Sequence, residues 1–300
     1  MPITIKPLHP LFAAEIGDVD LNRIDEASRA EIVAAINRYA VLVFHGQSLD
    51  DDQLLALGRT FGSIAAPRNP RTQHRLRHAE IADISNLDAK SGEVRQREDH
   101  RRLDALGNQL WHSDASFRPI SGELSMLFAH IVPPKGGDTE FADLRAAYDS
   151  LDAETRATAE GLMAEHSIFH SRGQLGHADY TEAERKSLPS VHHPLVRTHP
   201  GSKRKTLYMG AHASHIVGWP MPEGRLLIRE LMEHATQRRF TYAHKWQVGD
   251  LVVWDNRCTL HRGRPYEDGK HKRDLRRVTT QDLTSVDDNP ELVRELGLAS

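Results

Sequence analysis

A histidine and an aspartate two residues apart, His112 and Asp114, constrain this chain more than any other pair of residues. In an extended segment the side chains at i and i+2 point to the same side, so both can reach one metal ion. A second histidine must complete the set of ligands. His261 fits, because it follows the apolar run 251–254 and the tight-turn residues 255–256. A fold that completes this site must bring the two halves of the chain together.

Two histidines and one carboxylate, with coordination positions left open, form the facial triad of non-heme Fe(II) oxygenases. His-x-Asp alone is a weak signal, because it occurs often by chance. The chain also holds 19 histidines, and most of them must serve other purposes, since one metal site uses two or three. The triad is therefore a hypothesis that the rest of the sequence has to support.

Short apolar runs separated by turn residues predict a fold with many strands. Strands are expected within 3–21 and at 41–44, 81–86, 124–132, 139–141, 166–170 and 274–280, with hairpins joining 195–199 to 206–209 and 240–242 to 251–254. Helices are expected behind Asp25 or Ser28, behind a capping box at 48–51, and at 143–151, 153–163, 182–188 and 222–236. Segment 88–102 is expected to be an exposed loop. This pattern indicates an α+β fold with a mainly antiparallel sheet sandwich.

One domain over residues 1–300, with an acidic tail from about 282 to 300, fits better than two, because candidate ligands lie in both halves. The composition is that of an ordinary globular protein, with 39% hydrophobic and 27% charged residues and a net charge of -3. Neither a nucleic-acid partner nor a membrane partner is expected. The single cysteine, Cys258, suits a reducing compartment. We expect a cytoplasmic homo-oligomer.

Behind His261 lies a basic segment, residues 273–277. In an extended strand Arg273 and Arg277 face one side, and Asp274 and Arg276 the other. Two guanidinium groups would be costly to bury without anions, and guanidinium suits bidentate carboxylate binding. The segment therefore indicates either two carboxylate sites, one for a cosubstrate and one for a substrate, or a solvated edge strand.

A second basic segment, residues 63–78, carries four arginines and two prolines. It is either a solvated surface connection or a mobile flap over an anionic substrate. A role in nucleic-acid binding is disfavoured by the acidic overall balance and by the lack of aromatic residues between the arginines.

Several motifs together resemble the taurine/2,4-dichlorophenoxyacetate dioxygenase family. They are His112-x-Asp114, Gly136-Gly137-Asp138-Thr139, Trp254-Asp255-Asn256-Arg257, His261 and Arg273-x-x-x-Arg277. The stretches 9–14, 41–44, 82–86, 109–114, 210–215 and 233–238 are similar to the aryloxyacetate branch of that family. The resemblance spans about residues 8–281. It implies a double-stranded β-helix (jelly-roll) core with helical insertions.

The resemblance also implies an oxidoreductase that uses Fe(II), 2-oxoglutarate and O₂. It places the iron on His112, Asp114 and His261. Thr139 and Arg273 are then expected to bind the distal carboxylate of 2-oxoglutarate. Trp254 is expected to pack behind the site, and Cys258 to be a small buried residue.

The implied substrate is a small organic anion. The residues expected to lie near it are Arg277, Asn108, His199, His212 and His215. Hydroxylation of an aryloxyacetate at the carbon between ether oxygen and carboxylate yields a phenol and glyoxylate, with succinate and CO₂ from 2-oxoglutarate. Sulfonates, sulfate esters and phenoxypropionates offer a similar anion. The alternative from another class is a jelly-roll metal-binding sensor without turnover.

Overall fold

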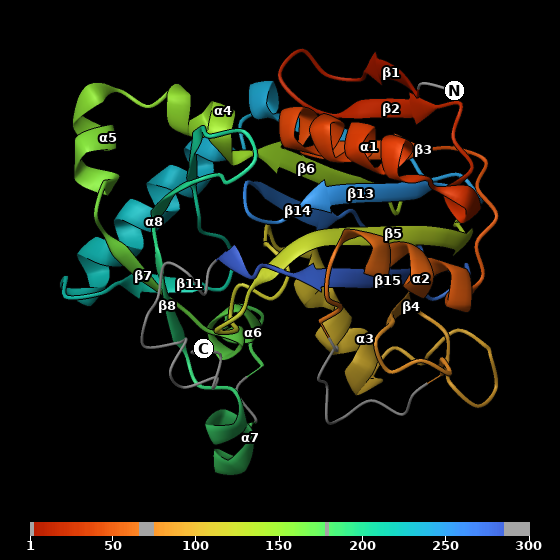
Figure 1. The fold of residues 1–300 in the computed structure, drawn as a ribbon. Helices are drawn as coiled ribbons and strands as arrows, with labels where there is room; N and C mark the ends of the chain where they lie inside the picture. The colour runs from red at the N-terminus through yellow and green to blue at the C-terminus, as the bar shows by residue number, and fades with distance from the viewer. Residues whose placement is uncertain (1–2, 66–74, 178–179, 285–300) are drawn as a thin grey trace, which may run out of the picture.

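A seven-stranded sheet forms the centre of the computed structural model, which describes residues 3–65, 75–177 and 180–284 (Figure 1). Its strand order is β1–β2–β3–β13–β5–β15–β4. The strands are Thr4–Pro7, Ala14–Gly17, Val41–Phe44, Leu251–Asp255, Gly122–Ile131, Asp274–Gln281 and Ala82–Ser85, in that order. Neighbours are antiparallel except β2 and β3, which are parallel.

Three smaller sheets complete the strand inventory of the described residues. The order β12–β6–β14 joins Thr241–His244, Thr139–Asp143 and Thr259–Gly263; the order β11–β7–β8 joins Ala213–Ile216, Met163–His166 and Val191–Pro194; and β10 (Lys205–Leu207) pairs with β9 (Val196–Thr198). The β12–β6–β14 sheet packs on the seven-stranded sheet through buried side chains that include Phe141, Val252 and Trp254. The centre of the protein is thus a mainly antiparallel arrangement of facing sheets, as the sequence predicted.

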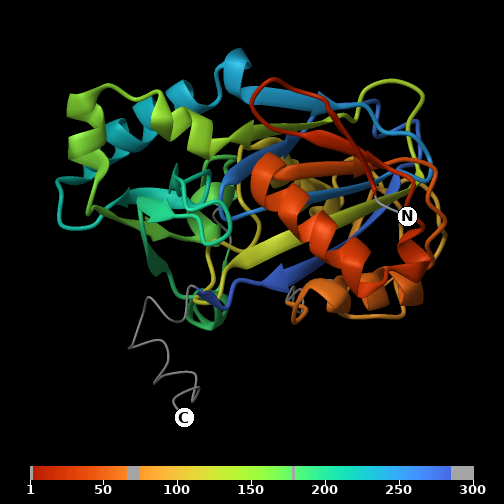
Figure 2. The same ribbon diagram turned by 45° about the horizontal axis from the view of Figure 1, so that its top comes forward.

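Helices cover the outside of these sheets. They are α1 (Glu26–Tyr39), α2 (Asp51–Phe61), α3 (His100–Ala105), α4 (Leu144–Asp149), α5 (Ala153–Ala159), α6 (Ile168–Gly173), α7 (Glu182–Ser187) and α8 (Met221–Ala235), with 3-10 turns η1 (Leu21–Arg23), η2 (Leu106–Gln109) and η3 (Arg238–Phe240). α1 and α2 lie on one face of the seven-stranded sheet, whereas α4, α5 and α8 lie beyond its end (Figures 1 and 2). No helix in these ranges is long and apolar enough to cross a bilayer.

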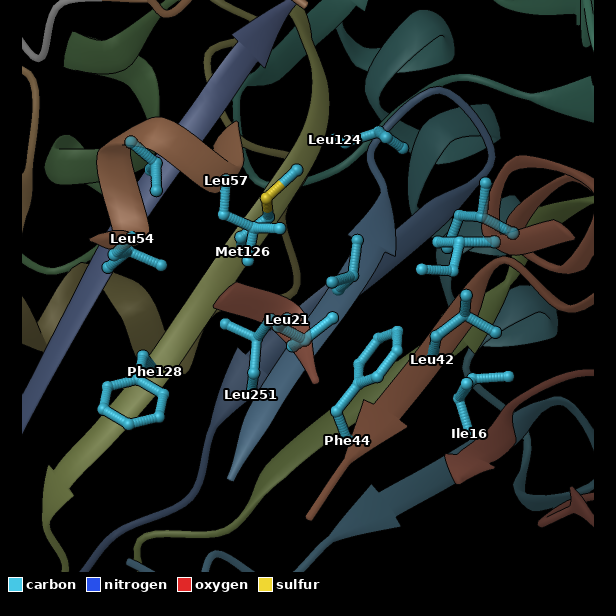
Figure 3. Close-up of a cluster of buried hydrophobic side chains, with 14 of the residues drawn as sticks. Ile16, Leu21, Leu42, Phe44, Leu54, Leu57, Leu124, Met126, Phe128 and Leu251 are labelled. Atoms are coloured by element: carbon cyan, nitrogen blue, oxygen red, sulfur yellow. The ribbon is translucent and has the colours of Figure 1, made fainter. Parts of the chain in front are cut away.

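Strand β13 explains why the central strands read as continuous apolar runs. Its residues alternate between faces, so that Leu251 and Val253 join the cluster beneath α1 and α2 (Figure 3). Val252 and Trp254 join the cluster between the facing sheets. Because both faces are covered, every residue of the strand is buried, and the first four are all apolar.

The side chains of strand β15 also alternate between the two faces of the sheet. Asp274 and Arg276 point toward α2, where Arg276 pairs with Asp51 at 2.6 Å. Leu275 belongs to the cluster between the sheets, and Arg273 and Arg277 share its face. The predicted separation of the two sets of side chains is therefore confirmed.

Two helix boundaries differ from the prediction. Helix α2 begins at Asp51, because Asp50 and Gln53 form the capping box that was expected to start at Ser48. Helix α5 ends at Ala159, since Gly161 has a φ of +75° that allows a turn into β7.

Three further local predictions were wrong. Segment 166–170 is not a strand, because β7 ends at His166 and α6 follows. The expected loop 88–102 already contains the start of α3, whose N-terminal amides are capped by the carboxylate of Asp99. Strands β12 and β13 do not form a hairpin, because β12 pairs with β6 and β13 with β3 and β5. Most of the basic segment 63–78 and of the acidic tail lies outside the described residues.

Candidate metal centre and substrate cavity

The two predicted ligand segments are joined by backbone hydrogen bonds. The amide of His112 donates to the carbonyl of His261 at 3.0 Å, and the amide of His261 donates back at 2.9 Å. Their ring centroids lie 4.2 Å apart. His261 is further held because β14 pairs with β6. The pairing of two distant segments thus sets the position of both imidazoles.

Asp114 turns back toward both histidines. Its Oδ1 lies 3.9 Å from Nε2 of His112, and its Oδ2 lies 3.7 Å from Nε2 of His261. All three side chains are buried, and the candidate ligand atoms lie within 4.8 Å of one another. Two imidazole nitrogens and one carboxylate on one side of a site are the donor set that suits Fe(II) with open positions.

Both imidazoles are in the form that binds a metal. Nδ1 of His112 donates to the carbonyl of Leu110 at 2.7 Å, which leaves Nε2 with its lone pair toward Asp114. Burial lowers the pKa of His112, and it lowers the pKa of His261 well below its ordinary value. Neutral imidazoles need not lose a proton before they coordinate an ion.

Asp114 is held ionised by its surroundings. Burial alone raises the pKa of this carboxyl, but the charge of Arg277, with smaller contributions from the neighbouring His261 and His112, outweighs it and lowers the pKa to about 2. Nη1 of Arg277 lies 2.5 Å from Oδ1, and the hydroxyl of Ser125 donates to Oδ2 at 2.7 Å. The carboxylate is therefore charged at neutral pH.

A set of hydrogen bonds behind Asp114 was not predicted. The amide of Asp114 donates to Oδ1 of Asn256 at 3.0 Å, and Nε1 of Trp254 donates to the same oxygen at 2.9 Å. Nδ2 of Asn256 donates in turn to the hydroxyl of Ser125 at 2.9 Å. Trp254 is fully buried, with its ring centroid 4.6 Å from that of His261, as expected for a packing residue behind the site. The available signals were Asn256, within the motif 254–257, and Ser125, a hydroxyl in a mostly apolar strand.

The candidate ligands form part of the wall of a cavity of about 470 Å³. This volume lies in the range that holds small organic ligands. Five more of the predicted site residues line it: Thr139, Arg273, Arg277, Asn108 and His212. The structure therefore brings together eight of the ten residues that the sequence singled out.

Arg273 offers a cation to this cavity. Its guanidinium lies 5.9 Å from the ring centroid of Tyr266 and donates to the carbonyl of Ile84 at 3.4 Å. Nε has no hydrogen-bond partner among the described residues. Thr139, at the start of β6, presents a hydroxyl that accepts from Nε1 of Trp246 at 3.0 Å. Burial lowers the pKa of Arg273, yet guanidinium keeps its charge.

Of the three histidines that the resemblance places near the substrate, only His212 lines the cavity. His212 lines the cavity, with its ring centroid 4.9 Å from that of Phe117 and 6.0 Å from that of His112. His215 lies outside the cavity lining and contacts Ser214 through Nδ1 at 2.8 Å. His199 also lies outside the lining, where Nε2 contacts Oδ2 of Asp255 at 2.9 Å. The expected substrate contacts of His199 and His215 are therefore not supported, because neither side chain lines the cavity.

Asp255 and its neighbours form a second buried cluster, which is structural. Asp255 accepts from His199 and from the guanidinium of Arg257, at 2.6 Å from Nη2. Cys258 lies beside it, and burial raises the pKa of its thiol. A buried thiol that stays protonated is a poor ligand and a poor nucleophile, which agrees with the small buried residue that the sequence predicted.

The fold and this site define a class: a metal-dependent enzyme with two histidines, one carboxylate and a cationic cavity beside them. The model of the family described as taurine catabolism dioxygenase TauD, TfdA family matches residues 4–279 of the chain. The chain belongs to this family.

Individual relatives agree with that assignment. The chain is 51% identical over 285 residues to the alpha-ketoglutarate-dependent 2,4-dichlorophenoxyacetate dioxygenase of Cupriavidus pinatubonensis, covering 94% of this chain and 99% of that protein. It is 35% identical over 274 residues to the (S)-phenoxypropionate/alpha-ketoglutarate-dioxygenase of Delftia acidovorans, covering 88% and 90%. The crystal structure of AAD-2 in complex with Mn(II) and N-oxalylglycine superposes with a TM-score of 0.89 at 45% identity, covering 94% of this chain and 98% of that one.

Proposed function

We propose that this protein is an Fe(II)- and 2-oxoglutarate-dependent dioxygenase that hydroxylates an aryloxyacetate such as 2,4-dichlorophenoxyacetate. The observation that carries the proposal is a His-Asp-His group in the wall of a cavity that also holds Arg273. Iron bound there, together with 2-oxoglutarate and O₂, supplies the hydroxylation. The relatives in Cupriavidus pinatubonensis and Burkholderia, at 51% and 48% identity, support the substrate class.

Arg273 and Thr139 are proposed to bind the distal carboxylate of 2-oxoglutarate. Arg273 is half-buried and makes no ion pair within the described residues, so an added carboxylate would stabilise its guanidinium. The hydroxyl of Thr139 can donate to the same carboxylate while it accepts from Trp246. The N-oxalylglycine bound in AAD-2 is also a small dicarboxylate, which supports this assignment.

The substrate side of the cavity suits an aromatic anion. Its wall includes the apolar side chains Phe117, Ile168, Phe169 and Leu188. Burial lowers the pKa of His212 well below its ordinary value, so this ring is neutral and can pack against an aromatic ring. Asn108 adds a polar group, and Arg277 places a charge beside the metal centre.

We further propose that the facing sheets are the two halves of a double-stranded β-helix core within a single domain that spans residues 1–300. The packing of Phe141 against Trp254, with ring centroids 5.5 Å apart, supports a shared core between the sheets. The cytoplasmic location and the homo-oligomeric state remain predictions from the sequence.

A paired assay tests the substrate class. With saturating Fe(II), ascorbate and 2-oxoglutarate, we expect phenol release from 2,4-dichlorophenoxyacetate and no sulfite release from taurine. Sulfite without phenol would contradict the aryloxyacetate assignment and leave the dioxygenase assignment standing. Succinate formed without either product would mean that the enzyme class is right and the substrate is another anion. Metal binding without any decarboxylation of 2-oxoglutarate would favour the alternative of a metal-binding sensor.

Arg273→Ala is expected to raise the KM for 2-oxoglutarate about 10- to 100-fold, because a buried charge-assisted contact contributes roughly 1.5–3 kcal/mol. The KM for the aryloxyacetate should change little. The matched control is Arg276→Ala, on the same strand but facing α2, which should leave the KM for 2-oxoglutarate unchanged. Equal shifts in the two variants would show that strand integrity, rather than a cosubstrate contact, explains the effect.

A further inference from the structure

Arg172 is a cation of the cavity to which neither the sequence nor the resemblance assigned a role. It lies in the last turn of α6 and lines the cavity together with His112, Asp114 and His212. Its positive charge also affects the pKa of two histidines beside the candidate metal site. Burial is the main cause of the low pKa of His212, and the neighbouring His112 and the charge of Arg172 add to it. Arg172 thus lines the same cavity as the metal ligands, and its charge helps to lower the pKa of His112 and His212.

The position of this guanidinium is fixed by a glycine. Gly107 is buried in η2, next to Asn108. A Cβ atom added at Gly107 would lie 1.8 Å from Nη1 and 2.4 Å from Cζ of Arg172. The guanidinium thus rests directly on the backbone of η2, and any side chain at position 107 would displace it.

Arg172 has no acidic partner in the described part of the chain. Asp104 and Tyr180 act on it only at longer range, and they offset only part of the burial that lowers its pKa. Other cavity arginines are paired: Arg277 with Asp114, and Arg102 with Asp268 at 2.9 Å. Because a desolvated cation without an anion is costly, a bound anion would stabilise Arg172.

We propose that Arg172 binds the carboxylate of the aryloxyacetate substrate and so sets which carbon faces the metal centre. This inference rests on the proposed function. Arg277 already directs Nη1 at Asp114. Arg172 pairs with no carboxylate among the described residues, and a guanidinium can bind a carboxylate through two parallel hydrogen bonds. The carboxylate of an aryloxyacetate is attached to the carbon to be hydroxylated. An anchor beside His112 and His212 therefore holds that carbon near the metal ligands.

The test compares an acid with its neutral amide. In Arg172→Met, we expect the KM for 2,4-dichlorophenoxyacetate to rise about 10- to 100-fold, because a charge-assisted contact is lost. The KM for 2,4-dichlorophenoxyacetamide should stay within about twofold of the wild-type value, since the amide has no charge to lose. The KM for 2-oxoglutarate should not change. Arg172→Lys should recover part of the affinity for the acid.

A second pair of variants moves the guanidinium without removing its charge. Gly107→Ala should raise the KM for the acid in the same direction as Arg172→Met, because the new methyl group displaces the guanidinium. Gly173→Ala is the matched control, since it lies next to Arg172 on the same helix with nothing within 4 Å of the added atom. It should behave as the wild type. Thermal unfolding checks that all variants are folded.

The outcomes separate the two proposals. Equal rises in KM for acid and amide, or an unchanged KM for the acid in Arg172→Met while phenol is still released, would overturn the role of Arg172 alone. A wild-type protein that releases phenol from no aryloxyacetate would overturn the proposed function, and the inference about Arg172 with it.

Discussion

Asp114→Ala is expected to lower metal-dependent turnover more than about 100-fold. Residues that only support a metal ligand typically contribute about 10- to 100-fold to affinity or activity, and a ligand itself should contribute more. The variant would leave two neutral imidazoles and the unpaired charge of Arg277 around the ion, because Arg277 now contacts Oδ1 of Asp114. Both changes weaken the binding of a divalent cation.

The measurement is a titration with Mn(II), followed by succinate formation at limiting Fe(II). Ser125→Ala is the graded control, since its hydroxyl only donates to Asp114 at 2.7 Å. It should lower metal affinity about 10- to 100-fold, less than the loss of the carboxylate. Full turnover of Asp114→Ala at limiting Fe(II) would refute the assignment of the ligand.

Arg145→Ala is expected to lower the free energy of unfolding by about 3–5 kcal/mol, as is typical when one partner of a buried ion pair is removed. Arg145 and Asp143 have side chains with no exposed area, and their closest atoms lie 3.0 Å apart. Arg145 also donates to the carbonyls of Asn37, at 2.8 Å, and Arg38, at 3.3 Å. The variant leaves a buried carboxylate without a counterion and two carbonyls without donors.

Urea unfolding followed by circular dichroism measures this loss. The control is Arg229→Ala, because Arg229 and Glu233 form an exposed pair on α8, and it should leave stability unchanged. Adding Asp143→Ala to Arg145→Ala should recover part of the loss, since the unpaired charge is then gone. A loss no larger than that of Arg229→Ala would mean that water reaches the Asp143 carboxylate.

Side-chain alternation and motif spacing predicted the parts of the site that depend on local geometry. His112 and Asp114 share a side because they are two residues apart, and the faces of β15 follow from its strand period. The choice among histidines could not be predicted this way. His199 and His212 both match histidines of the aryloxyacetate branch, yet one packs on Asp255 and the other reaches the cavity. That difference depends on how α6, β11 and the sheets pack, which no local pattern encodes.

Partner choice between strands was the other failure. The turn at 248–250 is a genuine turn, but it leads from β12 in one sheet to β13 in another. A hairpin and a connection between facing sheets have the same local signature, so the sequence could not distinguish them. Arg172 escaped notice for a similar reason. Arg172 contacts Gly107, which lies 65 positions earlier in the chain. It also has no carboxylate partner among the described residues, and neither fact can be read from a local pattern.

The alternation of β15 also limits how this strand can change in length. Inserting or deleting a single residue after Arg273 would turn Asp274 and Arg276 toward the cavity and direct Arg277 at α2, because each step along a strand reverses the side that a residue faces. With one residue inserted, the cavity face would carry Asp274 in place of Leu275, and Arg277 would no longer reach Asp114. Relatives with a site of this kind should therefore vary in the loop before β15, between Gly263 and Lys272, and keep the spacing of the two arginines at four.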